Sequence, residues 1–102
     1  MAVSKLDHLY LETRSFDETV AFWERLGFTL ASTWGQDGHR AGRLESGDAY
    51  IVLAESETPV LNVHFGVEEL EKLGTPETTH WGARLIRVKD PDGRTFVLEE
   101  TK

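Results

Sequence analysis

The feature that most constrains the fold is a pattern of secondary-structure signals that occurs twice along the chain. Residues 6–12 alternate apolar and polar side chains with a period of two, which is typical of a half-buried strand. Residues 16–26 carry apolar side chains at helical spacing, and strand-like runs follow at 28–33, 40–44 and 49–54. The first half is therefore predicted to be one strand, one helix and three further strands.

The predicted helix has a signal at each end. Ser15 followed by Glu18 has the spacing of a capping box, in which the two side chains accept hydrogen bonds from free backbone N–H groups of the first turn. Gly27 tolerates the left-handed backbone that commonly ends a helix. Trp23 falls on the apolar stripe of this helix, so we expect it in the core.

The pattern restarts after residues 55–59, a polar segment that ends in proline and is predicted to connect the two halves. Residues 60–65 favour a strand, and residues 67–74 favour a short helix that ends at its own glycine. The chain closes with a hairpin whose turn is Asp90-Pro91-Asp92-Gly93, because Pro presets φ, Asp bonds its own backbone and Gly tolerates positive φ. The second half is shorter because material is missing between residues 74 and 81.

We therefore predict an α+β fold of two βαβββ-type modules, the second shortened, within one domain of residues 1–102. The first module is expected at about residues 5–54 and the second at about residues 60–100. A chain of this length can bury one core and form one cleft, which excludes a second enzymatic domain. Because the shortened module leaves sheet edge or apolar surface uncovered, we expect a homodimer.

Charge and composition exclude several classes of function. Eighteen acidic and eleven basic residues give a formal charge of −7, which favours neutral or cationic partners and argues against nucleic acid and membranes. The chain has no cysteine, so disulfides, thiolate metal sites and cysteine nucleophiles are ruled out. We expect a cytoplasmic protein, because the start lacks the apolar segment of a signal peptide and no run approaches the roughly 20 apolar residues that span a bilayer.

Alternation along the predicted strands sorts their side chains onto two faces. The first face is aliphatic and is expected to form the core: Leu9, Leu11, Ile51, Leu53, Val63, Phe65, Phe96 and Leu98. The second face mixes aromatic, small, polar and ionisable groups: His8, Tyr10, Glu12, Tyr50, Val52, Ala54, Asn62, His64, Thr95, Val97 and Glu99. Such a mixture favours a ligand-binding surface over a core.

Segments spread over nearly the whole chain resemble the vicinal oxygen chelate superfamily, also called the glyoxalase/bleomycin resistance protein/dioxygenase group. The matching stretches are Leu6-Asp7-His8, the helix running into Phe22–Phe28, Val63-His64-Phe65, Trp81–Arg84, and Asp90–Gly93 with Leu98-Glu99. The resemblance implies that the modules form a curved mixed sheet cup, with helices on its outer face, commonly within a homodimer.

The resemblance also bears on cofactors. Members that use a metal carry ligands on the first and last strand of each module, and these positions correspond here to His8, Val52, Asn62 and Val97. Valine offers no lone pair and a neutral amide is a weak donor, so we expect no cofactor. The metal-free members, typified by bleomycin resistance proteins that sequester a drug without altering it, fit this residue set. The catalytic residues, if any, are unknown.

We expect a small organic ligand, cationic or aromatic. The predicted binding residues are His8, Tyr10, Tyr50, Val52, Asn62, His64, Val97, Glu99, Trp34 and Trp81. The two tryptophans are interpreted as an aromatic rim, with burial against a partner subunit as the alternative.

Other interpretations stay open. A metal-dependent lyase or dioxygenase would use a shifted divalent-metal site of His8, His64 and Glu99. A histidine beside a carboxylate would also act as an acid or base without metal, and a vestigial cup would make the protein an accessory partner. Arg84 is expected either to pair with Glu99 across the final hairpin or to bind a ligand carboxylate.

Overall fold

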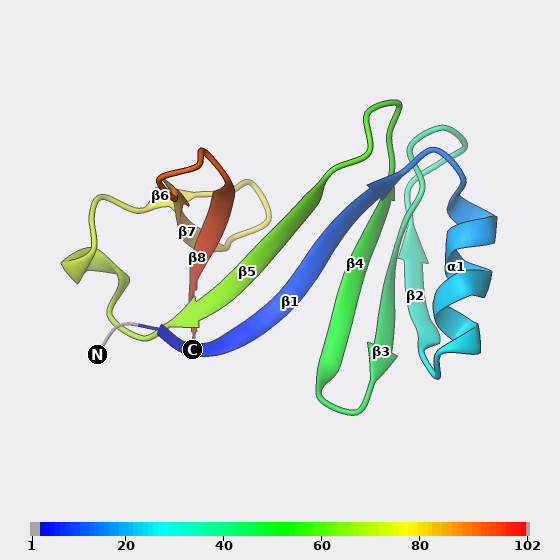
Figure 1. Cartoon of the computed structure of the whole chain (residues 1–102), viewed down its shortest axis with the longest axis horizontal. Helices are drawn as coiled ribbons and strands as arrows, with labels where there is room; N and C mark the ends of the chain where they lie inside the picture. The colour runs from blue at the N-terminus through cyan, green and yellow to red at the C-terminus, as the bar shows by residue number, and fades with distance from the viewer. Residues whose placement is uncertain (1–2, 102) are drawn as a thin grey trace. The chain divides into compact units, whose positions relative to one another are not determined.

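A computed structural model describes residues 3–101, which form two compact units. The helical unit comprises residues 8–61, and the hairpin unit comprises residues 62–101 together with residues 3–7. The first strand, β1 (Val3–Thr13), therefore contributes residues to both units (Figure 1).

The helical unit contains the only α-helix within the described residues. After β1 come α1 (Phe16–Arg25), β2 (Thr29–Trp34), β3 (Ala41–Ser46) and β4 (Ala49–Glu55). The strand order is β2-β3-β4-β1, with β1 parallel to β4 and the other pairs antiparallel. These bounds agree with the predicted elements to within two residues, except that β1 begins three residues earlier than predicted. Among residues 3–101, no helix has the length and apolar character needed to cross a lipid bilayer.

The hairpin unit repeats this pairing scheme with a much shorter helix. It contains β5 (Leu61–Val67) except for its first residue, the 3₁₀ helix η1 (Leu70–Lys72), β6 (Glu77–Thr78), β7 (Arg84–Lys89) and β8 (Thr95–Glu100). The strand order is β5-β8-β7-β6, with β5 parallel to β8 and the other pairs antiparallel. The α+β class and the mixed parallel and antiparallel pairing are confirmed.

The helix predicted over residues 67–74 is wrong in extent. Val67 is fully buried and belongs to β5, where its carbonyl accepts a hydrogen bond from the backbone N–H of Thr101 at 2.9 Å. Within residues 67–74 the helix is limited to the three residues of η1, which begins at the fully buried Leu70. The residues between the strands are therefore too few for a helix that could cover the sheet.

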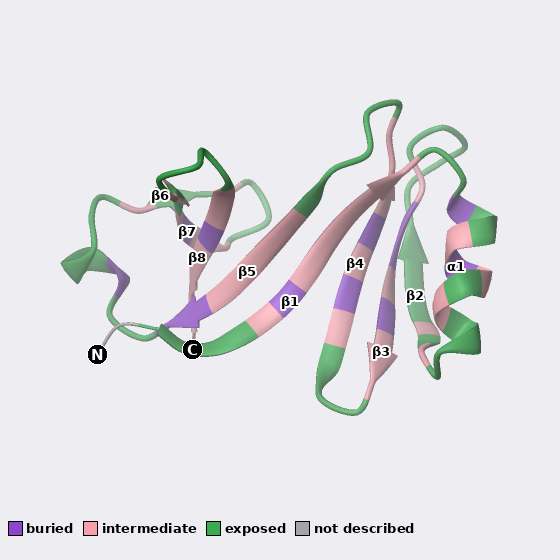
Figure 2. Ribbon diagram, viewed as in Figure 1, coloured by how far each residue is buried: buried purple, intermediate pink, exposed green. Residues whose placement is uncertain are grey.

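The core of the helical unit forms where α1 packs on its sheet (Figure 2). Its buried members are Phe16, Val20, Leu44, Ile51 and Leu53, and the partly buried members packed against them are Leu9, Leu11, Trp23, Phe28 and Leu30. Full burial of an aliphatic or aromatic side chain contributes about 1.5–3 kcal/mol. The predicted aliphatic face and the core position of Trp23 are thus confirmed in this unit.

The start of α1 differs from the predicted capping box. Ser15 is the N-cap, but its side chain makes no capping hydrogen bond. The backbone N–H of Ser15, which the Glu18 carboxylate would accept in a capping box, instead donates to Thr13 Oγ1 at 3.0 Å. A side chain just before the helix therefore takes the place of the one predicted inside it.

The end of α1 agrees with the prediction. Gly27 has φ +102°, its N–H donates to the Glu24 carbonyl at 3.0 Å, and the Phe28 N–H donates to the Trp23 carbonyl at 3.1 Å. These two bonds form a Schellman motif, and the rings of Trp23 and Phe28 meet edge to face at 5.3 Å. The motif turns the chain from α1 into β2.

The aliphatic face predicted for the second half is only half-buried. The four residues concerned are Val63, Phe65, Phe96 and Leu98. The buried apolar residues of the hairpin unit are Val67, Leu70, Leu85 and Val97. Burial here is incomplete because a three-residue η1 covers far less of a sheet face than the ten residues of α1 do.

The predicted final turn is confirmed. Asp90 Oδ1 accepts hydrogen bonds from the backbone N–H groups of Asp92 at 3.0 Å and Arg94 at 2.9 Å, and Gly93 has φ +84°. The turn sets the register of β7 against β8, in which Leu85 is the Cα partner of Glu99.

Candidate functional site

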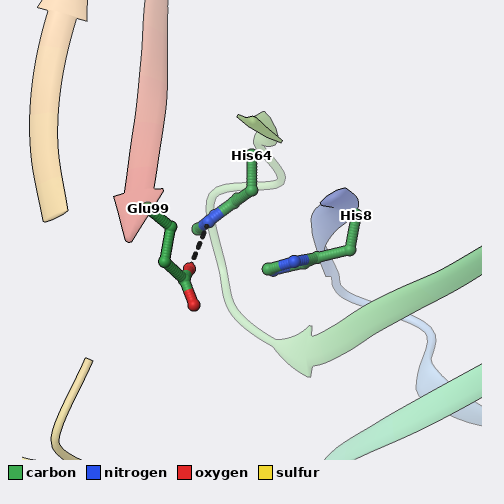
Figure 3. A group of neighbouring side chains, drawn as sticks. All are labelled: His8, His64 and Glu99. Carbon is green, nitrogen blue, oxygen red and sulfur yellow. Dashed lines mark hydrogen bonds and ion pairs between the residues drawn. The ribbon is translucent and has the colours of Figure 1, made fainter. Parts of the chain in front are cut away.

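The polar centre of the hairpin unit is a histidine–carboxylate pair. His64 on β5 and Glu99 on β8 lie on neighbouring parallel strands, and His64 Nδ1 lies 3.2 Å from Glu99 Oε1 (Figure 3). The side chains of His64 and Glu99 are 14% and 27% exposed, so the pair is partly shielded from solvent but remains accessible to it. With a proton on Nδ1, the imidazole donates to the carboxylate, which orients the ring. Sequence alternation predicted this shared face, and the structure brings the two groups together.

The chemistry open to this pair follows from its two groups. An imidazole nitrogen and a carboxylate oxygen are ligands that Zn, Fe, Ni and Mn accept, and each residue offers one such atom. Without a metal, the same pair has the composition of an acid–base dyad, because the carboxylate orients the imidazole for proton transfer. The pair alone supplies two ligands, one fewer than the smallest protein ligand sets of catalytic metal sites.

The helical unit presents an aromatic column. Tyr50 lies on β4, which is between β3 and β1 in the sheet. The Tyr50 ring stacks on the ring of His8, with the two centroids 4.5 Å apart and the planes at 17°. The guanidinium carbon of Arg43 lies 3.6 Å from the centroid of the Tyr50 ring. His8 is 9% exposed. The structure therefore brings the predicted site residues His8 and Tyr50 together.

Arg43 is a residue of this face that the sequence analysis missed. It alternates with the buried Leu44 on β3, and this alternation could have placed it opposite the core. Its Nε–H donates to Glu45 Oε2 at 2.5 Å. The helical unit thus carries a cation on the face where the sequence indicated mostly neutral and acidic groups.

Tyr10 adjoins this column on β1. Its hydroxyl donates to Glu12 Oε2 at 2.8 Å. Burial, followed by the hydrogen bond and negative charge of Glu12, raises the pKa of Tyr10 to about 12. Tyr10 therefore keeps its proton at neutral pH and continues to donate it to Glu12.

The two predicted rim tryptophans are exposed and lie at hairpins. Trp34 ends β2 and is 50% exposed, and Trp81 lies between β6 and β7 and is 66% exposed. The ring of His80 meets that of Trp81 edge to face at 4.7 Å. Exposed aromatic rings suit either predicted role, a ligand rim or a contact with a partner subunit.

Arg84 does not pair with Glu99, the partner that the sequence suggested, and it pairs with two other carboxylates instead. Its Nη1 lies 2.7 Å from Glu100 and 2.9 Å from Glu71. The β7–β8 register makes Glu100 the nearer partner, since Leu85 is opposite Glu99 and the preceding residue therefore points to the other face. Arg84 thus ties η1 to β8 and leaves Glu99 to His64.

A depression of about 230 Å³ lies at the start of α1. Arg40, which borders it, pairs with Glu55 at 3.0 Å and Asp17 at 3.1 Å and lies 4.9 Å from the ring centroid of Phe16. The hydrogen bonds from Arg40 hold the pKa of Glu55 below its usual value. These contacts link α1 to β4, so we assign Arg40 a structural role.

No known family profile matches the sequence, and no curated protein matches it. Several solved structures match over nearly the whole length of this chain. Methylmalonyl-CoA epimerase from Mycobacterium tuberculosis aligns with a TM-score of 0.72 at 18% identity, over 98% of this chain and 89% of that chain. A glyoxalase/bleomycin resistance protein/dioxygenase superfamily member from Vibrio splendidus 12B01 aligns with a TM-score of 0.73 at 17% identity, over 92% and 97% of the two chains.

The Mn(II)-bound glyoxalase from Novosphingobium aromaticivorans gives a TM-score of 0.70 at 14% identity, over 98% of this chain and 40% of that chain. The chain therefore shares the fold of these three structures, one of which is a glyoxalase/bleomycin resistance protein/dioxygenase superfamily member. The resemblance inferred from the sequence motifs is thereby confirmed at the level of the fold.

Within the glyoxalase/bleomycin resistance/dioxygenase fold, the residues at three expected metal-ligand positions are poor ligands. Val97 is 3% exposed, Val52 and Asn62 are half-buried, and neither valine carries a lone pair. His64 and Glu99 each lie two residues beyond the expected positions on their strands, and therefore on the same faces. The hairpin unit therefore has an imidazole and a carboxylate that a metal accepts, but each lies two residues further along its strand than the superfamily positions.

Proposed function

We propose that this protein binds a small organic molecule, such as an antibiotic or a metabolite, without a metal at the four positions implied by the superfamily. The observation that carries the proposal is Val97, which is 3% exposed where a carboxylate ligand would be required. Val52 and Asn62 support it, because one has no donor atom and the other only a weak one.

The binding faces supply the contacts that such a ligand needs. The aromatic column of His8 and Tyr50 offers flat surface, while the hydroxyl of Tyr10 and the pair of His64 and Glu99 offer hydrogen bonds. Small-molecule sites commonly combine apolar and aromatic area with a few such polar groups. The protein would act by sequestering the molecule unchanged.

Thermal unfolding in the presence of a panel of antibiotics and common metabolites tests this function. A ligand at one hundred times its Kd stabilises the folded state by about 2.7 kcal/mol, which a shift in Tm detects. We expect at least one compound to raise Tm and to be recovered unchanged after incubation. Conversion of that compound into a product would contradict sequestration.

A second candidate function is a metal-dependent lyase or dioxygenase with a shifted site of His8, His64 and Glu99. The observation that favours it is the pair of His64 and Glu99, which already supplies an imidazole and a carboxylate. This function requires His8, which belongs to the helical unit, to supply the third ligand.

Metal analysis of protein purified without chelator separates the two functions. Stoichiometric Zn, Fe, Ni or Mn that is lost in His64→Ala and retained in His80→Ala would favour the enzyme and overturn the metal-free proposal. His80 is a matched control because it is exposed and outside the pair. Metal content well below one ion per chain in all three proteins supports the metal-free proposal.

We further propose that the protein is a homodimer. The half-buried apolar residues of the hairpin unit, Phe65 and Phe96 among them, would be covered by a second copy. Sedimentation at micromolar concentration is expected to give twice the 11.5 kDa chain mass. A mass of one chain would reject the dimer.

A further inference from the structure

Arg43 is held in a fixed position on the ligand face of the helical unit. The carbon of its guanidinium lies 3.6 Å from the centroid of Tyr50, so the cation rests on the ring face. Its Nε–H donates to Glu45 Oε2 at 2.5 Å, and its side chain is 41% exposed. Two contacts therefore restrain a side chain that usually has high rotamer freedom.

These contacts use only part of the guanidinium. Of its five N–H donors, the one on Nε bonds to Glu45. Within residues 3–101, the four donors on Nη1 and Nη2 have no hydrogen-bond partner, and the side chain is open enough for a ligand to reach them. Two parallel N–H groups on a planar fork match the two oxygens of a carboxylate.

The residues in line with Arg43 favour an acid with an apolar body. Arg43 and Tyr10 are both Cα partners of Val52, so the three residues form a row across β3, β4 and β1. Two strand spacings separate the Cα atoms of Arg43 and Tyr10 by about 10 Å, so a single-ring carboxylic acid has a size that can lie across the row. Val52 supplies apolar surface in the middle of the row, and Tyr10 supplies an aromatic ring whose hydroxyl is bonded to Glu12.

We infer that Arg43 binds the carboxylate of a small flat organic acid, whose apolar body lies over Val52 toward Tyr10. The inference rests on the proposed small-molecule function and names the chemical class of its ligand. The charge of −7 on the whole chain acts at long range and affects mainly the rate of approach. A charge-assisted bidentate hydrogen bond acts at contact and decides which charge is held.

Three probes of one shape separate the charge classes: benzoate, benzyl alcohol and benzylammonium. Titration calorimetry on the full chain is expected to show that benzoate binds at least tenfold more tightly than the other two. Arg43→Gln is expected to weaken benzoate at least tenfold, since charged hydrogen bonds contribute about 1.5–3 kcal/mol. Arg43→Lys keeps the positive charge but not the planar fork, so its affinity for benzoate is expected to lie between those of the unmodified protein and Arg43→Gln.

Arg87→Gln is the matched control, because Arg87 is an exposed strand arginine that pairs with a glutamate, Glu77, in the hairpin unit. It is expected to bind benzoate as tightly as the unmodified protein does. An unchanged Tm in both arginine variants shows that binding and not folding has been altered.

The assignment fails if Arg43→Gln binds benzoate as tightly as the unmodified protein does, or if benzoate has no advantage over benzyl alcohol. If benzylammonium or benzyl alcohol binds best, the proposed small-molecule function stands and only the role of Arg43 is overturned. If none of the three binds at millimolar concentration, the role of Arg43 is overturned, and the antibiotic and metabolite panel decides the proposed function separately.

Discussion

The helical and hairpin units share one strand scheme and differ in what covers the aliphatic side of the sheet. In each unit the first and last strands pair in parallel, and an arginine at or just before the third strand, Arg40 or Arg84, bonds to the helix and to the last strand. The helical unit adds ten residues of α1, whereas the hairpin unit adds three residues of η1.

The consequence is a difference in burial at corresponding positions (Figure 2). Leu53, on the last strand of the helical unit, is fully buried, whereas Leu98, on the last strand of the hairpin unit, is half-buried. The same side-chain type on the same kind of strand therefore has a different environment in each unit. Helix length, more than strand sequence, decides whether such a face becomes a core.

The largest expected effect is a direct test of this difference in burial between the two units. Leu53→Ala should lower the free energy of unfolding by about 3 kcal/mol, because it leaves a cavity in a packed core, and Leu98→Ala by only about 1 kcal/mol. Denaturant unfolding of both variants measures the difference. If Leu98→Ala costs as much as Leu53→Ala and its cost depends on protein concentration, a second copy covers the hairpin unit.

The second prediction concerns the helix that only one unit possesses. Gly27→Ala and Gly93→Ala each place a side chain at positive φ, with φ +102° and +84°, and each should cost about 1 kcal/mol. Only Gly27→Ala should lower the helical circular dichroism signal, because Gly27 ends α1 and Gly93 lies in a β-turn. Equal loss of signal in both variants would show that the two units unfold together.

The third prediction compares the two arginine links. Arg40→Gln should lower the denaturation midpoint more than Arg84→Gln does. Arg40 bonds to Glu55, which is 15% exposed, and also lies over the Phe16 ring, whereas Glu100, the nearer partner of Arg84, is 25% exposed. A larger effect at Arg84 would mean that η1 depends on its ion pairs to stay on the sheet.

The smallest effect is a change in ionisation. The pKa of Tyr10 is raised from 10.0 to about 12, so the unfolded chain loses this proton first as pH rises. The contribution of Tyr10 to stability is complete below pH 10 and is lost between about pH 10 and 12. Absorbance titration should show one tyrosine ionising near 12, and Tyr10→Phe should abolish that step. Persistence of the step in Tyr10→Phe would assign it to Tyr50.

Much of the fold could be predicted because its signals are local. The end of α1 at Gly27 and the turn at Asp90–Gly93 depend on backbone preferences of single residues, and both agree with the structure. The capping box failed because Thr13, outside the helix, takes the backbone N–H that Glu18 would accept. The length of the second helix failed because the backbone of Val67 pairs with Thr101, a contact distant in sequence.

The candidate site was predicted in part for the same reason. Alternation placed His64 and Glu99 on one face, and the structure joins them at 3.2 Å. Arg43 was missed although alternation with Leu44 marks it, because its importance comes from the ring of Tyr50 on the next strand. The partners of Arg84 also depended on strand register, which sequence spacing alone leaves open.

The sequence by itself determined the α+β class, the face of each strand residue, the C-terminal end of α1 and the final turn, because these follow from periodicity and from the backbone preferences of individual residues. Only the tertiary structure decided which aliphatic face is covered, that His64 meets Glu99, and that Arg43 lies against Tyr50. Those outcomes depend on which strands become neighbours and in what register, and pairing between distant segments is not encoded in any local pattern.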